Sequence, residues 1–321
     1  MPHKVLITDY YYPTLDEERR VFAETGIEIC DGNGRCKTPE DVIALGEDAD
    51  AIITQFVPIT RGIIERLRRC KVIVRYAIGV DTIDIPAATE RRIMVANVPD
   101  YCIAEVSDHA LALIMALVRK VKVMDAEVQS GIWAYRRAVP VRRLGELTLG
   151  LIGFGHIARE VARKARALGF GRVSAFDPYV KEVDPALGVS LAPLDGVLAQ
   201  ADVLSIHAPA TSESHHLIDG DALRRLKRGA FVVNTSRGSL VDEAALARAL
   251  KDGQVAGAAL DVLEDEADIE ASPLRGLEDV ILTPHMAWYS TGAIQELQRK
   301  VAEQVRDALL VGRPSYWVNR F

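Results

Sequence analysis

The stretch LGLIGFGHIA at residues 149–158 is the most informative part of the chain. A short apolar run, which predicts a buried strand, leads directly into a glycine-rich turn, and residues 159–168 continue with helical periodicity. Gly153 permits the tight turn, Gly155 lets phosphates approach bare backbone, and Ala158 is small enough for the helix to pack on the strand. The positive end of that helix then faces the phosphates. We therefore predict that a dinucleotide is contacted by Gly153, Phe154, Gly155, His156 and Ile157.

An acidic residue follows at the spacing that such a site requires. The next predicted strand, 173–176, ends at Asp177, nineteen positions after Ala158. A carboxylate there accepts hydrogen bonds from the hydroxyls of an adenosine ribose and repels a 2′-phosphate. No Arg or Lys follows before Lys181 to neutralise such a phosphate. The sequence therefore favours NAD over NADP, with Asp177 and Pro178 at the cofactor, over the alternative of a glycine turn without a ligand.

Composition indicates an ordinary soluble enzyme. The 321 residues suggest two domains, and 49% of them are hydrophobic, which suffices for sizeable cores. The net charge of -6 argues against general affinity for nucleic acid. The N-terminus lacks a signal-like apolar core and no apolar run is long enough to cross a bilayer, so we expect a cytoplasmic protein without a membrane partner. Four cysteines without metal-finger spacing predict reduced thiols and no metal site.

Short β-rich runs alternate with helical patterns along the whole chain, which is typical of parallel α/β folds. The first group of expected strands covers 5–8, 27–30, 51–54, 72–74 and 94–96, with helical signals at 15–24, 39–45, 61–69 and 85–91. A long apolar helix, 104–122, is expected to link two domains. The second group comprises six strands, namely the two described above and those at 203–207, 230–234, 257–259 and 280–282. A final helix near 292–310 is expected to return to the first domain.

Three polar clusters directly follow strands of the second group. They are NTSRG at 234–238, DVLEDE at 261–266 and TPH at 283–285. Ligands of open α/β sheets bind beyond the carboxyl ends of strands. Taken singly, each cluster has an ordinary explanation. A loop arginine such as Arg237 most often forms a surface ion pair, an acidic run is usually a solvated face, and a lone histidine such as His285 is most often structural. Their shared position at strand ends of one nucleotide-binding sheet favours chemistry: a guanidinium that clamps a carboxylate and an imidazole that exchanges a proton.

These motifs together resemble those of the NAD-dependent D-isomer-specific 2-hydroxyacid dehydrogenases, and the resemblance covers nearly the whole chain. The matching motifs are the glycine turn, NxxRG at 234–238 with VDE at 241–243, LDVxExE at 260–266 and TPH at 283–285. In that family an Arg binds the substrate carboxylate, a His is the general acid/base and a Glu supports the His. The resemblance places these roles on Arg237, His285 and Glu266. It implies further cofactor contacts at His207, Ala208, Pro209, Thr235, Ser236, Arg237, Asp261 and His285, with Asp261 at the nicotinamide carboxamide.

The first domain carries a segment that resembles the family's substrate loop at 75–84. The residues implied to bind substrate are Arg75, Tyr76, Ala77, Ile78 and Gly79, with the amides of Ile78 and Gly79 holding the carboxylate. The sequence departs from the family's common pattern at Ala77, Thr82 and Ala267, where Gly, Asn and Pro are usual, and these departures bear on the shape of the substrate pocket. Residues 284–290 look most like the C-terminal-binding-protein branch, so Trp288 is the candidate that reads the substrate's side chain; the alternative is a hydrophobic staple between the domains.

The resulting expectation is a fold with two doubly wound parallel sheets, a Rossmann NAD-binding domain (99–288) inserted in a flavodoxin-like substrate domain (1–98 and 289–321). The expected activity is the interconversion of a 2-oxo acid and a D-2-hydroxy acid, acting as a reductase. Hydroxypyruvate, glyoxylate, branched or thioether 2-oxo acids and 3-phosphohydroxypyruvate all fit, so 3-phosphoglycerate dehydrogenase lacking a regulatory domain is one alternative. An NADH-sensing co-regulator is another. Pairing of His285 with Glu266 disfavours a formate-dehydrogenase-like enzyme, which pairs His with Gln. The family usually forms homodimers.

Overall fold

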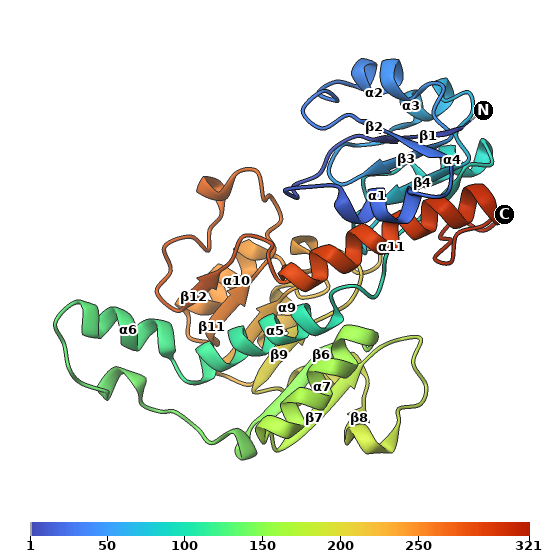
Figure 1. The fold of residues 1–321 in the computed structure, drawn as a ribbon. Helices are drawn as coiled ribbons and strands as arrows, with labels where there is room; N and C mark the ends of the chain where they lie inside the picture. The colour runs from blue at the N-terminus through green and yellow to red at the C-terminus, as the bar shows by residue number, and fades with distance from the viewer. Residues whose placement is uncertain (1) are drawn as a thin grey trace. The chain divides into compact units, whose positions relative to one another are not determined.

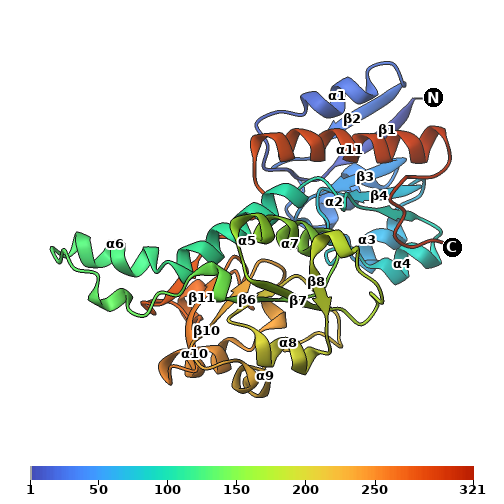
Figure 2. The same ribbon diagram turned by 90° about the horizontal axis from the view of Figure 1, so that it is seen from below.

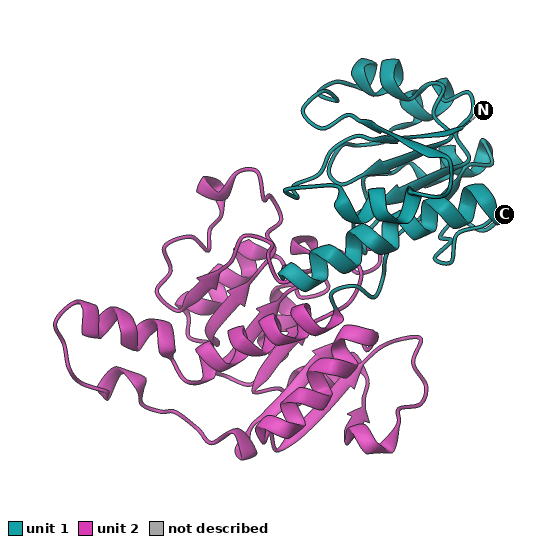
Figure 3. Cartoon of the chain, in the orientation of Figure 1, with its two compact units in different colours: residues 1–102, 290–321 teal, residues 103–289 magenta. Residues whose placement is uncertain are grey.

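The computed structural model describes residues 2–321, which form two compact units (Figure 3). The first unit combines the chain up to residue 102 with residues 290–321, and the second unit comprises residues 103–289. The second unit is therefore inserted in the sequence of the first. None of the helices in residues 2–321 combines the length and the apolarity needed to cross a bilayer.

The first unit is built on a five-stranded parallel sheet. Its strand order is β2 (Ile27–Asp31), β1 (His3–Ile7), β3 (Ala51–Thr54), β4 (Val72–Arg75) and β5 (Met94–Ala96). This 2-1-3-4-5 order is that of flavodoxin-like folds. The helices of this unit are α1 (Asp16–Phe22), α2 (Pro39–Gly46), α3 (Arg61–Arg66), α4 (Ile85–Glu90) and α11 (Thr291–Leu310). The expected return of the last helix is confirmed, because α11 packs on α1, β3 and β4.

The second unit contains a seven-stranded parallel sheet, not the six strands expected. The order is β12 (Val280–Leu282), β11 (Val255–Leu260), β10 (Ala230–Asn234), β9 (Val203–Ile206), β6 (Thr148–Ile152), β7 (Arg172–Phe176) and β8 (Val189–Leu191). From β6 outward this is the 3-2-1-4-5-6 order of a Rossmann fold with one further strand at the β12 edge. The strand that sequence reasoning missed is β8. It pairs on one side alone and none of its three residues is buried, so no buried-strand pattern marks it.

Helices cover both faces of this second sheet (Figures 1 and 2). The helices of the second unit are α5 (Ile103–Val118), α6 (Val121–Gln129), α7 (His156–Leu168), α8 (Leu194–Gln200), α9 (Gly220–Arg225) and α10 (Glu243–Lys251), with 3-10 turns at η1 (Arg136–Ala138), η2 (Leu144–Glu146), η3 (Pro185–Leu187), η4 (Gly238–Leu240) and η5 (Ile269–Ala271). Val232 belongs to the core beneath α8 to α10 and Val233 to the core beneath α5 and α7. Both are fully buried, as expected for adjacent residues of a strand covered on both faces.

The single helix expected at 104–122 is corrected in two respects. The structure divides it into α5 and α6 because Lys120 adopts the left-handed conformation at φ 54°. Apolar residues continue across that break, so periodicity alone did not reveal it. In addition, α5 belongs to the second unit, where it packs on α7, β10 and β11 and contributes the buried Ile114 and Leu117 to their core.

Parallel pairing aligns the carboxyl ends of the strands that carry the polar motifs. One row of paired residues crosses the sheet: Phe176, Ile152, Ile206, Asn234, Leu260 and Leu282. The glycine turn, the 207–209 loop, the Arg237 loop, the 261–266 segment and the 283–288 segment all begin within one or two residues of this row. The fold therefore brings these motifs to one edge of the second unit's sheet.

Candidate active site

Gly153 and Gly155 build an open turn between β6 and α7. Gly153 has φ +84°, and a Cβ there would lie 2.7 Å from the amide nitrogen of Ala208, so only glycine fits. The turn thereby lies against the 207–209 loop. Above Gly155, by contrast, a Cβ would meet no atom within 4 Å. The bare backbone of Gly155 caps the thirteen-residue helix α7, whose first residue is His156. This end of α7 is suited to an anionic ligand.

Asp177 has a structural task that the sequence did not reveal. One carboxylate oxygen accepts a hydrogen bond from the Phe154 amide at 2.8 Å. The other accepts from the amides of Tyr179 at 2.9 Å and Val180 at 3.2 Å. Asp177 thus ties the glycine turn to the end of β7 and stays partly exposed. Pro178, the adjacent predicted contact, is exposed.

The loops after β9 and β10 supply polar groups of different character. Burial lowers the pKa of His207 to about 4, so its ring is neutral at pH 7, and it shares a hydrogen bond with Ser205 Oγ at 2.9 Å. The Ser236 hydroxyl donates to the Ile206 carbonyl at 2.9 Å and joins the two loops. The hydroxyl oxygen of Thr235 is buried and has no hydrogen-bond partner in residues 2–321. An orphaned buried hydroxyl next to an open turn fits a group that binds a ligand.

The Arg237 loop is fixed by backbone contacts on both sides of the guanidinium. The Asn234 side chain accepts from the Ser236 amide at 3.0 Å and donates to the Arg237 carbonyl at 2.8 Å. Arg237 Nη1 donates to the Ser236 carbonyl at 2.8 Å. At Gly238 a Cβ would lie 1.9 Å from the carbonyl carbon of Leu263, so this position admits only glycine. Gly238 therefore lets the Arg237 loop touch the segment that carries Glu266.

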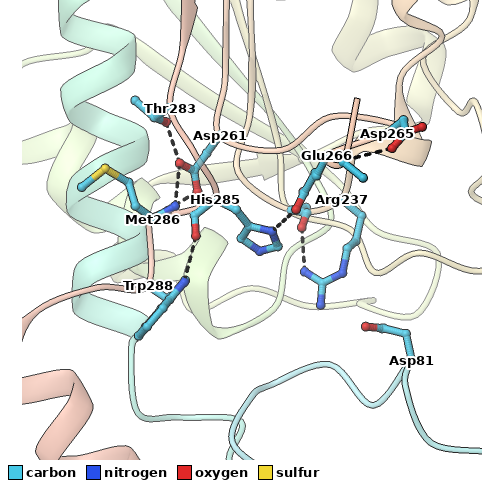
Figure 4. Close-up of polar contacts among 12 residues, drawn as sticks. Asp81, Arg237, Asp261, Asp265, Glu266, Thr283, His285, Met286 and Trp288 are labelled. Atoms are coloured by element: carbon cyan, nitrogen blue, oxygen red, sulfur yellow. Dashed lines mark hydrogen bonds and ion pairs between the residues drawn. The ribbon is translucent and has the colours of Figure 1, made fainter. Parts of the chain in front are cut away.

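His285 and Glu266 form the pair that the sequence predicted (Figure 4). His285 Nδ1 lies 2.9 Å from a Glu266 carboxylate oxygen, and the two side chains are 41% and 46% exposed. His285 also adopts φ +50°, which is uncommon for a residue with a side chain. Its amide donates to the Asp261 carbonyl at 2.8 Å. The turn after β12 thus directs the imidazole toward Glu266 and leaves Nε2 for other chemistry.

Asp261 supports this turn from inside. It is 1% exposed, and its carboxylate accepts hydrogen bonds from Thr283 Oγ1 at 2.5 Å and from the amides of Met286 at 3.0 Å and Ala287 at 2.8 Å. Burial alone would raise the pKa of Asp261, but these bonds and one from His109 together lower it. The carboxylate is therefore charged and holds the backbone on both sides of His285. A contact of Asp261 with the nicotinamide carboxamide stays a prediction.

His109 on α5 is a residue of this network that sequence reasoning missed. Its Nε2 lies 3.0 Å from Thr283 Oγ1 and 3.5 Å from a carboxylate oxygen of Asp261. Because the Thr283 hydroxyl donates its hydrogen to Asp261, His109 Nε2 must carry the proton and donate. His109 is 174 positions from Thr283 in the sequence, and nothing in the surrounding helical pattern marks it.

Trp288 is held by the same turn. Its indole nitrogen donates to the His285 carbonyl at 2.8 Å, and its ring meets that of Tyr289 edge to face at 5.8 Å. The side chain is partly exposed. The backbone of His285 therefore fixes the position of the Trp288 indole, which keeps this ring beside the imidazole.

In the first unit, Arg75 and Tyr76 hold the segment 75–79 from within. Arg75 is 9% exposed and donates to the carbonyls of Gln55 at 3.1 Å and Gly79 at 3.0 Å, and to Asp81 at 2.9 Å. The Tyr76 hydroxyl donates to the buried Glu18 at 2.6 Å. Both side chains are thus engaged with the protein itself.

The backbone of the same segment presents two amides outward. The Ala77 carbonyl accepts from the Val98 amide at 3.1 Å, and the Ile78 carbonyl accepts from Asn97 Nδ2 at 2.6 Å. In a trans peptide the following N–H points opposite to the carbonyl, so the amides of Ile78 and Gly79 point away from these donors. This arrangement is what a carboxylate site made of backbone amides needs.

Comparison with known proteins identifies the family. Residues 111–287 match the model of the D-isomer specific 2-hydroxyacid dehydrogenase NAD binding domain. The glyoxylate reductase of Korarchaeum cryptofilum is 38% identical over 275 residues, which are 84% of this chain and 81% of that protein. The chain belongs to the D-isomer-specific 2-hydroxyacid dehydrogenase family. The resemblance inferred from the motifs is thereby confirmed.

Two further comparisons show how much of the chain and of its relatives is covered. The D-3-phosphoglycerate dehydrogenase of Methanocaldococcus jannaschii is 35% identical over 95% of this chain. The chain spans only 57% of that relative's length. The structure of D-lactate dehydrogenase from Aquifex aeolicus, complexed with NAD and lactic acid, superimposes with a TM-score of 0.85 at 27% identity and covers 99% of this chain and all of that one. The expected two-sheet fold is confirmed, and the family's cofactor is NAD.

Proposed function

We propose that this chain catalyses the NAD-dependent interconversion of a 2-oxo acid and a D-2-hydroxy acid and works as a reductase. The observation that carries the proposal is the pairing of His285 with Glu266 at 2.9 Å, at the sheet edge that also bears the glycine turn. The open backbone at Gly155 and the orphaned Thr235 hydroxyl support a bound dinucleotide at that edge. Family membership supports the same reaction class.

NADH, when bound, supplies the hydride that adds to the substrate's carbonyl carbon. His285 donates the proton from Nε2 to the carbonyl oxygen, because Nδ1 is engaged with Glu266. The Glu266 carboxylate holds the ring at Nδ1 and thereby fixes the direction in which Nε2 points. In the opposite direction neutral His285 accepts the hydroxyl proton. Asp261 holds the turn that aims the ring.

Arg237 is assigned the substrate carboxylate. A guanidinium binds a carboxylate through two parallel hydrogen bonds and cannot lose its charge at physiological pH. In the first unit, the amides of Ile78 and Gly79 are assigned to the carboxylate as well, with Arg75, Tyr76 and Ala77 shaping the segment that presents them. We infer that Trp288 contacts the substrate's side chain, a role carried over from the C-terminal-binding-protein-like segment.

Several 2-oxo acids present the same carboxylate and carbonyl to these residues, so the substrate is identified by comparing their turnover. We propose to test glyoxylate, hydroxypyruvate, a branched 2-oxo acid, a thioether 2-oxo acid and 3-phosphohydroxypyruvate with NADH. Turnover of the last would favour a phosphoglycerate dehydrogenase. NADH binding without turnover of any acid would favour the NADH-sensing co-regulator instead.

The assignment of His285 and Glu266 is tested by the kinetics of 2-oxo acid reduction. His285→Ala should lower kcat by several orders of magnitude while NADH binding, measured by fluorescence, is retained. Glu266→Ala removes the group that holds Nδ1 of His285, so kcat should fall while NADH binding is again retained. Glu266→Gln keeps a hydrogen-bond partner for Nδ1 and should recover part of that loss. Full activity of His285→Ala would refute the mechanism, and an unchanged kcat in Glu266→Ala would refute Glu266 as the partner.

We further propose a cytoplasmic homodimer. Cys30, Cys36 and Cys70 are free thiols, which suits a reducing compartment. A segment of the second unit around α6 exposes several large apolar side chains, which suits an interface with a second copy of the chain. The negative net charge and the absence of a candidate spanning helix in residues 2–321 give no support to nucleic-acid or membrane partners.

A further inference from the structure

Two histidines and one glutamate converge beside the proposed site without a role in it. His215 and His216 lie in the loop that follows β9, and Glu264 follows β11. One potential ligand atom of each residue lies within 4.8 Å of the others. His216 Nε2 is in close contact with a carboxylate oxygen of Glu264. All three residues belong to the second unit.

The backbone is bent so that both imidazoles face the same way. Neighbouring side chains of an extended chain point to opposite sides. Here His216 adopts φ +48°, and the two rings stack with centroids 4.0 Å apart and planes inclined by 29°. A left-handed conformation costs a residue with a side chain roughly 1–2 kcal/mol. The His216 amide donates to the Ser239 carbonyl at 2.8 Å, which holds this bend.

Glu264 is fixed from the other side. Its amide donates to a carboxylate oxygen of Glu243 at 2.7 Å, and the preceding residue, Leu263, lies against Gly238. The side chains of His216 and Glu264 are 34% and 36% exposed, so solvent and small ions can reach them. The three side chains are thus placed by their backbones and remain accessible.

We propose that His215, His216 and Glu264 bind a divalent transition-metal ion of the zinc class. Two imidazole nitrogens and one carboxylate oxygen suit Zn²⁺, Co²⁺, Ni²⁺ or Cu²⁺, whereas Mg²⁺ and Ca²⁺ favour oxygen ligands alone. Ligand atoms around tetrahedral Zn²⁺ are about 3.4 Å apart, as follows from bonds of about 2.1 Å. Small side-chain rotations bring the three atoms to that spacing, and water completes the fourth position.

An ion pair between His216 and Glu264 does not explain the whole arrangement. It explains neither the left-handed backbone at His216 nor the position of the His215 ring against the His216 ring. The ion takes a place between His216 and Glu264 and uses the ring of His215 as its third ligand. It links the loop after β9 to the loop after β11, and Glu266 lies two residues beyond Glu264. This proposal does not depend on the proposed dehydrogenase activity.

The test is a Co²⁺ titration of the untagged, EDTA-dialysed protein, followed by visible d–d absorption and by thermal unfolding. We expect one Co²⁺ per chain, displacement by Zn²⁺ and a rise in Tm, because an ion that binds the folded state alone stabilises it. His215→Ala, His216→Ala and Glu264→Gln should each weaken binding by more than about a hundredfold, beyond the effect usual for residues that merely support a metal ligand. Glu270→Gln, which removes an exposed carboxylate paired with Arg275, is the matched control and should bind like the native chain.

Glu264→His distinguishes a metal ligand from an ion-pair partner. A third imidazole retains the ion, whereas it cannot replace the carboxylate in an ion pair with His216. Circular dichroism confirms that each variant is folded. Absence of Co²⁺ binding by the native chain, or binding that none of the three substitutions weakens, would overturn the proposal. Loss of Co²⁺ binding in a folded Glu264→His variant would also overturn it.

Discussion

We expect the Asp177 side chain to have two tasks: it holds the glycine turn and it selects NADH over NADPH. Its oxygens accept three backbone amides, which leaves one lone-pair site, on the oxygen that accepts from the Phe154 amide. Asp177→Asn keeps one oxygen for the turn but removes the negative charge that repels a 2′-phosphate. We expect this variant to use NADPH better relative to NADH, measured as the ratio of the two kcat/KM values on any working substrate.

Two further variants separate the tasks of Asp177. Asp177→Ala also removes the tie to Phe154, so KM for NADH should rise in addition. Asp184→Ala removes an exposed carboxylate that caps η3 and serves as the control whose cofactor preference is unchanged. A native enzyme that uses NADPH as well as NADH would contradict the assignment.

Glu18 offers a pH test of the first unit's interior. It is fully buried, accepts from Tyr76 at 2.6 Å and from Gln298 at 3.0 Å, and burial raises its pKa despite these bonds. A carboxyl group whose pKa is raised by folding favours the folded state below its unfolded pKa and loses that advantage as pH rises through the folded pKa. Glu18→Gln keeps the shape and an oxygen acceptor but cannot ionise.

The expected result for Glu18→Gln is a Tm above that of the native chain at pH 8, with the difference shrinking as the pH is lowered toward 4. Thermal unfolding by circular dichroism across this range is the measurement. Glu24→Gln changes an exposed carboxylate just beyond α1 and should follow the native curve at every pH. A difference between Glu18→Gln and the native chain that does not vary with pH would show that Glu18 stays charged when buried.

At the scale of single residues, the sequence identifies candidate reacting side chains better than it identifies the residues that hold them in place. Arg237, Glu266 and His285 were predicted because their side-chain types follow strands and match family motifs. The roles of Asp177 as a tie, of Gly238 as a close approach and of Tyr76 as a partner of Glu18 were not predicted. Each depends on a contact between segments distant in sequence, and no local pattern encodes such a contact.

At the scale of elements, α5 acts on the site through His109. The Nε2 proton of His109 supports Thr283 and the charged Asp261, which fix the backbone around His285. His109→Ala should lower kcat roughly tenfold, which corresponds to about 1.4 kcal/mol in the barrier and to the loss of one hydrogen bond to a charged group. His109→Gln offers an N–H donor of similar reach and should recover most of the activity.

The readout must separate this positioning role from general destabilisation. KM for NADH and the Tm of His109→Ala and His109→Gln are therefore compared alongside kcat. We expect kcat to follow the donor, low in the Ala variant and restored in the Gln variant, at similar NADH affinity. Equal kcat in the two variants would show that the hydrogen bond donated by His109 has no effect on turnover.

Elements with strong periodicity were predictable, whereas their interruptions were not. The parallel sheets and the place of the motifs at strand ends follow from alternating β and α patterns. The edge strand β8 was not predicted because none of its residues is buried and no apolar run marks it. The break between α5 and α6 was not predicted because apolar residues continue past Lys120, where local backbone geometry, not side-chain pattern, ends the helix.

At the scale of the whole molecule, the chain displays an apolar arm that a monomer would leave in water. The segment from α6 to η2 projects from the second unit's sheet (Figures 1 and 2). Its exposed apolar side chains include Ile132 at 48%, Trp133 at 90%, Tyr135 at 77% and Val139 at 63% exposure. Monomers rarely expose contiguous apolar surface of this kind. Tryptophan and tyrosine are also the residues most enriched among those that dominate interface energies.

We therefore expect the native chain to sediment as a dimer, and Trp133→Asp to weaken dimerisation. Burying an uncompensated carboxylate and losing a central aromatic contact should cost at least about 2 kcal/mol, or roughly thirtyfold in the dissociation constant. Sedimentation velocity over a range of protein concentrations measures that shift. Tyr11→Asp replaces an equally exposed aromatic of the first unit, 87% exposed, and should leave the dimer intact. A native chain that stays monomeric at all concentrations, or a Tyr11→Asp variant that dissociates as readily as Trp133→Asp, would show that the arm does not hold a second copy.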